Sequence, residues 1–310
     1  MTKNSNKFNL IVVLGPTATG KTSFAAHLAN AINSEIISAD SRQVYRHMNL
    51  GTGKDYSDYI VNGKIIPCHL IDIREPGTKY NIFEYQNDFF QVYKNLINKG
   101  ITPILCGGTG LYIESIVKQY KLIAVPVNEK LRAKLSDKTL EELEQILSNY
   151  KILHNRTDTD TLKRALRAIE IEEYYKSHPD LSQNFPEIKP VYIGISTDRE
   201  TRRQNITERL HKRIANGMIE EVKFLLQKNI SPDDLIYYGL EYKYITLHLV
   251  GKLSYEEMVK KLNAAIHQFA KRQMTWFRKM EREDCNIHWI DTREKMEIKL
   301  ATALSILGRA

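Results

Sequence analysis

The chain has 310 residues, of which 42% are hydrophobic, and it carries a formal net charge of +8 at pH 7. This composition can bury a large core and excludes a disordered chain, while the positive charge indicates an anionic partner, with nucleic acid as the first candidate. The three cysteines are far apart and form no CxxC pair, which is typical of a reduced intracellular protein. No apolar run approaches membrane-spanning length, so we expect a cytoplasmic protein without a membrane partner.

The first strong motif is GPTATGKT at residues 15–22, between the apolar run Leu10 to Leu14 and a helical pattern. Its glycines let the backbone turn its amide groups inward, and the helix that begins at Lys21 adds its positive dipole end. An ordinary glycine-rich turn is the alternative, but the place between strand and helix disfavours it. We predict a nucleotide-binding or ATP-binding type of phosphate loop (P-loop) that holds a di- or triphosphate through Gly15, Pro16, Thr17, Ala18, Thr19, Gly20, Lys21 and Thr22, with Mg²⁺ on the Thr22 hydroxyl.

Short apolar runs alternate with longer amphipathic stretches along the first and last parts of the chain. One such stretch, Asn81 to Asn98, places apolar residues, among them Phe89 and Ile97, near one helical face and is followed by Gly100. The pattern predicts an α/β fold with a P-loop NTPase-like core and a mostly parallel sheet. The expected strands are Leu10 to Leu14, Glu35 to Ser38, His69 to Ile73, Thr102 to Cys106 and Val191 to Ile195.

Polar residues follow two of these strands, where ligands of α/β sheets bind. In ADSRQVY at 39–45, Asp40 could ligate Mg²⁺, cap a helix or act as a general base, and Arg42 and Gln43 could contact a base or a phosphate. In GGTGLY at 107–112, Thr109 is the one hydroxyl among glycines. The preceding strand, Thr102 to Cys106, does not end in the acidic Mg²⁺ ligand that is common in ATPases. Asp72 is an alternative acidic candidate, but its apolar setting favours a structural role.

The segment 121–188 has no strand pattern and predicts a helical insertion between core segments 1–120 and 189–310. Thr139 and Glu142 form a capping-box spacing, and a second helix, with Leu162 facing inward, is expected from near Asp160. Its outward face carries Lys163, Arg164 and Arg167, although Arg167 could simply pair with Glu170 at i, i+3.

The last third of the chain is basic and helical. Ser254 and Glu257 predict the start of a long helix whose apolar face includes Ile266, Phe269 and Phe277. Its basic side could bind nucleic acid phosphates or be an ordinary solvated face. We expect Trp276 and Phe277 to be core residues rather than stacking platforms.

Taken together, the motifs resemble the bacterial tRNA dimethylallyltransferases, also called tRNA isopentenyltransferases. The matching pieces span most of the chain in the family's order: GPTATGKT, ADSRQVY, HLID at 69–72, GGTGLY, RALRAIE at 164–170 and AKRQMTWFR at 270–278. The resemblance implies a prenyltransferase that moves a dimethylallyl group from dimethylallyl diphosphate to the exocyclic amine of an adenine next to the tRNA anticodon. The phosphate loop would then bind the leaving diphosphate with Mg²⁺.

The resemblance also implies residue roles. Asp40 would accept the proton of the amine, Thr109 would help to place the amine or an allylic phosphate, and Arg213 would reach the diphosphate. The tRNA anticodon loop would contact Asp40, Ser41, Arg42, Gln43, Lys163, Arg164, Arg167, Lys271, Arg272, Gln273, Thr275 and Arg278. The protein is expected to act as a monomer on a base that has left its stack.

The chain departs from the family pattern at three places. The family usually has about one more helical turn between Arg213 and Gly217. Its GYKE-like tetrad is here Gly239 to Tyr242, with a longer spacer after it. Its usual Thr-Arg before AKRQ is here Ile266-His267.

Three alternatives stay open: an adenylate isopentenyltransferase that acts on free nucleotide, a P-loop small-molecule kinase, and a non-catalytic RNA-binding module. The basic C-terminal helix argues against the first, the lack of an arginine-rich lid pattern against the second, and the intact phosphate loop with Asp40 against the third.

Overall fold

The computed structural model describes residues 8–152, 159–178 and 185–309, which divide into two compact units. The larger unit comprises Met1–Tyr120 and Glu187–Ala310, and the smaller unit is Lys121–Pro186. The helical insertion predicted from the sequence was the segment 121–188. Within the described ranges, no helix is both long and apolar enough to cross a membrane.

The larger unit is built on a six-stranded sheet in which every pair of neighbouring strands is parallel. Its order is β5-β2-β6-β1-β7-β8, with β1 fully buried at the centre and Val13 in register with Cys106 and Ile193. The predicted α/β class and parallel sheet are therefore confirmed. The strands are β1 (Leu10–Leu14), β2 (Ile36–Ser38), β5 (Cys68–His69), β6 (Ile104–Gly107), β7 (Pro190–Ser196) and β8 (Ile287–Asp291).

Two strand predictions need correction. The run His69 to Ile73 contributes only its first residue to β5, because Leu70 and Asp72 adopt positive φ angles of 62° and 54° that no extended strand can contain. The edge strand β8 was not predicted, and neither was the hairpin of β3 (Ile60–Val61) and β4 (Lys64–Ile65).

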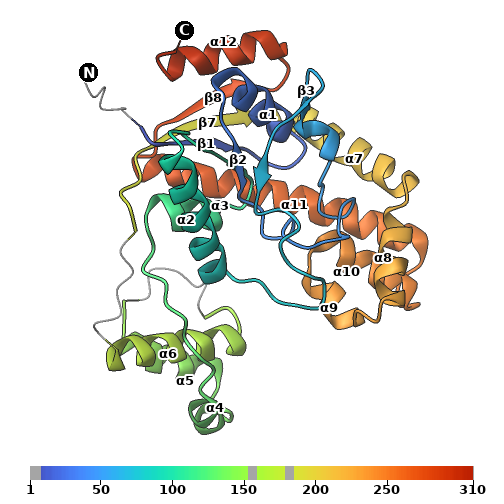
Figure 1. Ribbon diagram of the computed structural model, residues 1–310. Helices are drawn as coiled ribbons and strands as arrows, with labels where there is room; N and C mark the ends of the chain where they lie inside the picture. Colours follow the sequence, from blue (N-terminus) through green and yellow to red (C-terminus); the bar gives the residue numbers. More distant parts are fainter. Residues whose placement is uncertain (1–7, 153–158, 179–184, 310) are drawn as a thin grey trace. The chain divides into compact units, whose positions relative to one another are not determined.

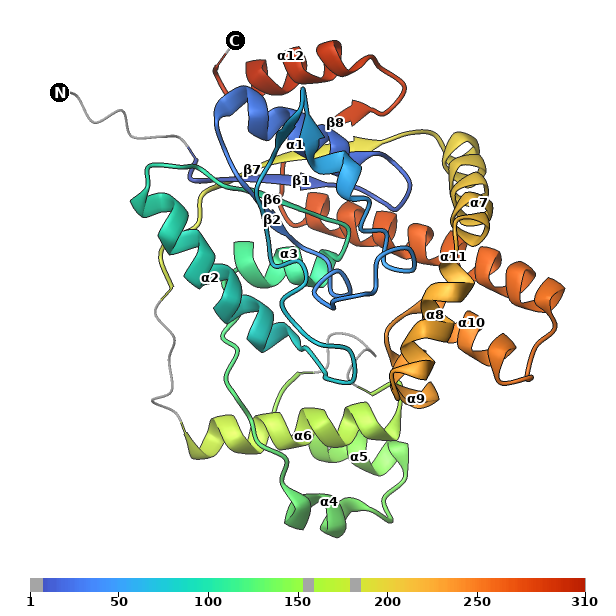
Figure 2. The ribbon, with the colours of Figure 1, turned by 45° about the vertical axis from the view of Figure 1, so that its right-hand side comes forward.

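Helices cover both faces of the sheet (Figures 1 and 2). One face carries α1 (Lys21–Ile32) and α12 (Met296–Ile306), and the other carries α2 (Ile82–Asn98), α3 (Gly110–Val117) and α11 (Tyr255–Arg282). The remaining helical elements of this unit are η1 (Tyr56–Tyr59), α7 (Arg199–Ala215), α8 (Met218–Gln227), α9 (Pro232–Tyr237) and α10 (Leu240–Leu249).

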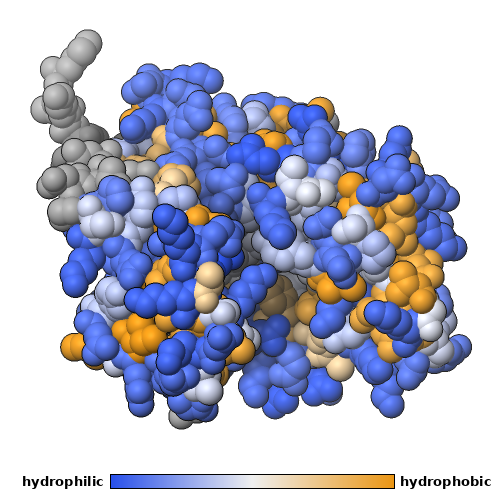
Figure 3. All heavy atoms as spheres, turned by 90° about the horizontal axis from the view of Figure 1, so that it is seen from below, coloured by the Kyte–Doolittle hydropathy of each residue, from blue (hydrophilic) through white to orange (hydrophobic). Residues whose placement is uncertain are grey.

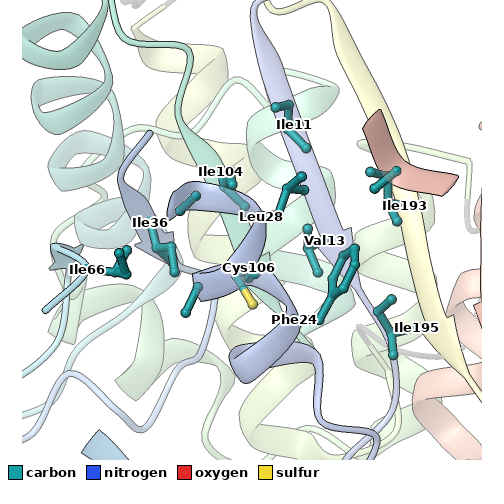
Figure 4. Packing of buried hydrophobic residues seen from close by; sticks show 14 of the residues in the cluster. Ile11, Val13, Phe24, Leu28, Ile36, Ile66, Ile104, Cys106, Ile193 and Ile195 are labelled. Atoms are coloured by element: carbon teal, nitrogen blue, oxygen red, sulfur yellow. The ribbon is translucent and has the colours of Figure 1, made fainter. Parts of the chain in front are cut away.

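The core between the sheet and α1 follows the strand periodicity of two. Ile11 and Val13 point to α1 and meet Phe24 and Leu28 (Figure 4), whereas Leu10, Val12 and Leu14 face the opposite side and are also fully buried. A strand buried on both faces explains the unbroken apolar run at the start of the chain. Polar residues dominate the face seen in Figure 3, with scattered apolar ones between them.

The long helices confirm their predicted starts and correct parts of their predicted faces. Ser254 and Glu257 form the capping box of α11, and α2 has one at Asn81 and Glu84 that was not predicted. Ile97 of α2 and Phe269 of α11 were placed on the apolar faces, but they are 39% and 37% exposed.

The smaller unit contains α4 (Glu129–Leu135), α5 (Leu140–Ser148) and α6 (Leu162–Ser177) around a leucine-rich core. The predicted capping box of Thr139 and Glu142 is confirmed. Helix α6 begins after the N-cap Thr161, and Leu162, which was expected to face inward, is exposed.

Candidate active site

The phosphate loop follows β1 and is shaped by two glycines. A Cβ atom on Gly15 would lie 2.2 Å from the carbonyl oxygen of Ile195, and Gly20 adopts a φ of 69° directly before α1. The buried Thr19 hydroxyl donates to the carbonyl oxygen of Pro16 at 3.0 Å. Thr19 therefore holds the loop together through its side chain.

Two cations lie over this loop. Lys21 Nζ donates to the Pro16 carbonyl oxygen at 3.3 Å, and Nη2 of Arg209 donates to the Thr17 hydroxyl oxygen. Burial lowers the pKa of Lys21, and burial together with the nearby Arg213 lowers the pKa of Arg209 to about 10. An anionic ligand that pairs with these cations would relieve both effects.

Two arginines of α7, Arg209 and Arg213, line the cavity beside the phosphate loop. Arg213 lines the same cavity but is committed to Asp55, with Nη2 to Oδ2 at 2.9 Å. Arg209, one turn earlier on α7, is the arginine that contacts the loop.

Asp40 is held by the turn that follows β2. Its Oδ1 accepts hydrogen bonds from the backbone N–H groups of Arg42 at 2.8 Å and Gln43 at 3.3 Å. The carboxylate thus organises its own turn rather than capping a helix, and Asp40 also lines the cavity beside the phosphate loop. A turn of this kind fixes the direction in which the carboxyl group points.

Thr109 reaches the cavity through the loop after β6. A Cβ atom on Gly107 would lie 2.2 Å from the carbonyl oxygen of Ala39, so this loop packs directly against the strand end that leads to Asp40. Thr109 is the N-cap residue of α3, yet its side chain makes no capping hydrogen bond. Thr109 lines the same cavity as Asp40.

These residues surround one cavity of about 270 Å³. It is lined by the phosphate loop, the loops after β2 and β6, and residues of α7, α10 and α11. A larger groove of about 1020 Å³ between α7 and α11 contains no residue of the phosphate loop. The cavity lining comprises Thr17, Lys21, Asp40, Ser41, Arg42, Gly51, Thr52, Gly108, Thr109, Arg209, Arg213, Tyr238, Gly239, Leu240, Glu241, Ile266, Phe269, Arg272 and Gln273.

Two amides that were expected to contact tRNA form hydrogen bonds within the protein. The buried Gln273 accepts from the Thr17 N–H at 2.8 Å and donates to the Gly108 carbonyl oxygen at 2.9 Å, so it joins the phosphate loop to the loop after β6. Gln43 Nε2 donates to the Gly53 carbonyl oxygen at 3.2 Å. Either side chain would have to exchange these bonds before it could bind RNA.

The other expected tRNA contacts of α11 are exposed. Lys271, Arg272, Thr275 and Arg278 all reach the surface of this helix, and Arg272 also lines the cavity. Phe277 is fully buried, as expected for a core residue.

Trp276 packs so closely that a Cβ atom on Gly110 would lie 2.3 Å from its ring. Trp276 is only partly buried, however, and Lys279 Nζ lies 5.1 Å from the centroid of its ring, so it packs at the edge of the core.

Within the smaller unit, Lys163 and Arg164 are exposed on α6, whereas Arg167 has a structural role. Arg167 donates to Glu170 at 2.8 Å and to the Val125 carbonyl oxygen at 2.7 Å. The ion-pair alternative for Arg167 is therefore confirmed.

Glu241 is a cavity residue that the sequence analysis did not single out. Burial raises the pKa of its carboxyl group, and the nearby Arg213 and Arg209 act in the opposite direction. A carboxylate in the first turn after Gly239 was the available signal.

The structural role of Asp72 is confirmed, because it pairs with the buried Lys54.

For Mg²⁺, the sequence offered Thr22, which lies partly buried in the first turn of α1. Among the described residues, no group of three or more histidine, cysteine or acidic side chains could hold a metal ion.

Comparisons with known proteins agree with this architecture. A tRNA dimethylallyltransferase of Parabacteroides distasonis is 61% identical over 97% of this chain and 98% of its own length, and one of Bacteroides fragilis is 60% identical over 94% and 96%. A crystal structure of a tRNA isopentenylpyrophosphate transferase from Bacillus halodurans matches with a TM-score of 0.71 and 28% identity, covering 97% of this chain and 95% of that one.

A eukaryotic dimethylallyltransferase acting on tRNA shares the fold, with a TM-score of 0.75 at 18% identity over 97% of this chain and 80% of that one. The family model described as Isopentenyl transferase matches residues 8–64, and the one described as IPP transferase matches residues 43–280. The chain belongs to the IPP transferase family.

Proposed function

We propose that this protein transfers the dimethylallyl group of dimethylallyl diphosphate to the exocyclic amine of an adenine next to the tRNA anticodon and releases diphosphate. The observation that carries the proposal is the shared cavity, in which Lys21 and Arg209 lie over a phosphate loop and the anchored carboxylate of Asp40 faces the same space. The names of the relatives support the same reaction.

In this reaction the C–O bond of the donor breaks while a C–N bond to the adenine forms. The charge that develops on the departing diphosphate is stabilised by Lys21, Arg209 and the loop amides. Asp40 accepts the proton that the amine must lose, since the amine's lone pair is delocalised into the ring and makes it a weak nucleophile. We assign Thr109 the role of orienting the amine or an allylic phosphate oxygen.

Mg²⁺ would be held by the Thr22 hydroxyl together with diphosphate oxygens. When bound, the ion would neutralise part of the charge on the leaving group.

The acceptor is a base that has left its stack, because the cavity cannot admit a duplex. Exposed cations supply the phosphate contacts, and we assign Ser41, Arg42, Lys163, Arg164, Lys271, Arg272, Thr275 and Arg278 to tRNA. Gln43, Gln273 and Arg167 shape the surfaces that carry these residues. We propose that the protein works as a monomer in the cytoplasm, where its tRNA substrate is found.

The test uses the purified protein with dimethylallyl diphosphate and unmodified tRNA, followed by mass spectrometry of the nucleosides. Asp40→Asn keeps an oxygen that can accept from the Arg42 and Gln43 amides, so the turn should persist. Loss of the base should lower kcat by roughly a hundredfold or more with little change in donor binding. Asp233→Asn, an exposed position on α9, is the matched control.

Two results would replace this proposal. Prenylated AMP together with inert tRNA would indicate an adenylate isopentenyltransferase, and phosphate transfer from ATP to a small acceptor would indicate a kinase.

A further inference from the structure

An exposed aromatic ring stands beside the active-site cavity and is covered by two cations. Tyr237, the last residue of α9, is 42% exposed. Arg42 Cζ lies 4.9 Å and Lys79 Nζ lies 5.7 Å from the centroid of its ring. Arg42 lines the cavity, as do Tyr238 and Gly239, the two residues after Tyr237.

This ring is held on a rigid support. The neighbouring Tyr238 is buried, its ring lies 4.4 Å from that of Tyr45, and its hydroxyl accepts from the Gly77 N–H at 2.7 Å. The end of α9 and the loop that carries Lys79 are thereby fastened to each other. A ring fixed in this way loses little conformational entropy when a ligand stacks on it.

Arg42 connects the ring to the candidate base. Its backbone N–H donates to Asp40 Oδ1 at 2.8 Å, and its guanidinium lies over Tyr237. A residue two positions from the carboxylate thus lies against the aromatic ring. A nucleobase that stacked on this ring in place of the guanidinium, with Arg42 turned to a flanking phosphate, would be the neighbour of the adenine whose amine lies at Asp40.

We propose that Tyr237 is a stacking platform for the unpaired base adjacent to the target adenine, with Arg42 and Lys79 contacting the flanking phosphates. The inference rests on the proposed function and adds a recognition site to it. Single-stranded RNA presents both a π face and phosphate charge, which this ring and its two cations match. The proposed function already assigns the diphosphate donor to Lys21 and Arg209 at the phosphate loop.

The experiment measures KM and kcat with anticodon stem–loop RNAs that carry either a normal base or an abasic site on each side of the target adenine. Tyr237→Ala should raise the KM for normal RNA about tenfold, the scale of one lost base stack, and leave the KM for dimethylallyl diphosphate unchanged. Tyr237→Phe should retain wild-type values. On the RNA that is abasic at the stacked position, wild type and Tyr237→Ala should perform equally.

Phe224→Ala is the matched control, because Phe224 is 41% exposed and carries Lys228 Nζ 5.5 Å from its ring centroid, but does not line the cavity. The inference is overturned if Tyr237→Ala costs as much on both abasic RNAs as on normal RNA, or if Phe224→Ala has the same effect. A wild-type protein that prenylates no RNA at all would instead refute the proposed function.

Discussion

Replacing Gln273 by Leu tests whether this amide joins two loops of the active site or binds tRNA. The substitution leaves two backbone groups without their partner: the Thr17 N–H at 2.8 Å and the Gly108 carbonyl oxygen at 2.9 Å. The part-buried Thr17 N–H can bind water in place of the amide, so the loss of its hydrogen bond costs about 0.5–1.5 kcal/mol. The buried Gly108 oxygen is left without a partner, which costs about 1–3 kcal/mol. The free energy of unfolding should therefore fall by roughly 2–4 kcal/mol.

The assay is urea denaturation followed by steady-state kinetics. Because Thr17 belongs to the phosphate loop, the KM for dimethylallyl diphosphate should rise together with the loss of stability. Gln268→Leu, the same substitution at an exposed position of α11, serves as control and should change neither quantity. Unchanged stability with a higher KM for tRNA alone would refute this reasoning and would make Gln273 a tRNA contact.

Three further predictions concern buried carboxylates and a close backbone approach. Burial raises the pKa of Glu241 in the folded state, so the wild type should lose stability relative to Glu241→Gln as pH rises above about 4.3, the unfolded pKa of a glutamate. The measurement is the Tm of both proteins as a function of pH, and a Tm difference that stays constant with pH would contradict this prediction. Burial alone would raise the pKa of Glu170, but hydrogen bonds from Arg132 and Arg167 outweigh this effect and lower the pKa to about 2. Glu170 therefore stabilises the smaller unit above its unfolded pKa of about 4.3, and this stabilisation is lost as pH falls to about 2. Glu170→Gln should flatten that acid-induced loss in circular dichroism melts, and an unchanged profile would count against it. Gly107→Ala places a methyl group against the Ala39 carbonyl oxygen, so the free energy of unfolding should fall by about 1–3 kcal/mol and kcat should fall as well. A wild-type value for either quantity would argue against a tight contact between the two strand ends.

Local signals in the sequence were sufficient for most of the framework. The phosphate loop, the capping boxes at Thr139 and Ser254 and the fully buried central strand depend on short-range backbone geometry and hydrophobic periodicity, so they can be predicted before the fold is known. The strand predicted after His69 does not form, because Leu70 and Asp72 adopt positive φ angles, which an apolar run does not reveal.

The partners of the polar side chains could be decided only by the tertiary structure. Gln273 and Thr17 are 256 residues apart, and Arg209 and Thr17 are 192 residues apart. No local pattern tells an amide that joins two loops from one that awaits RNA, or shows that Arg209 rather than Arg213 lies over the phosphate loop. A sequence specifies which groups can donate, accept or carry charge, but which of them meet depends on how β1, α7 and α11 pack together.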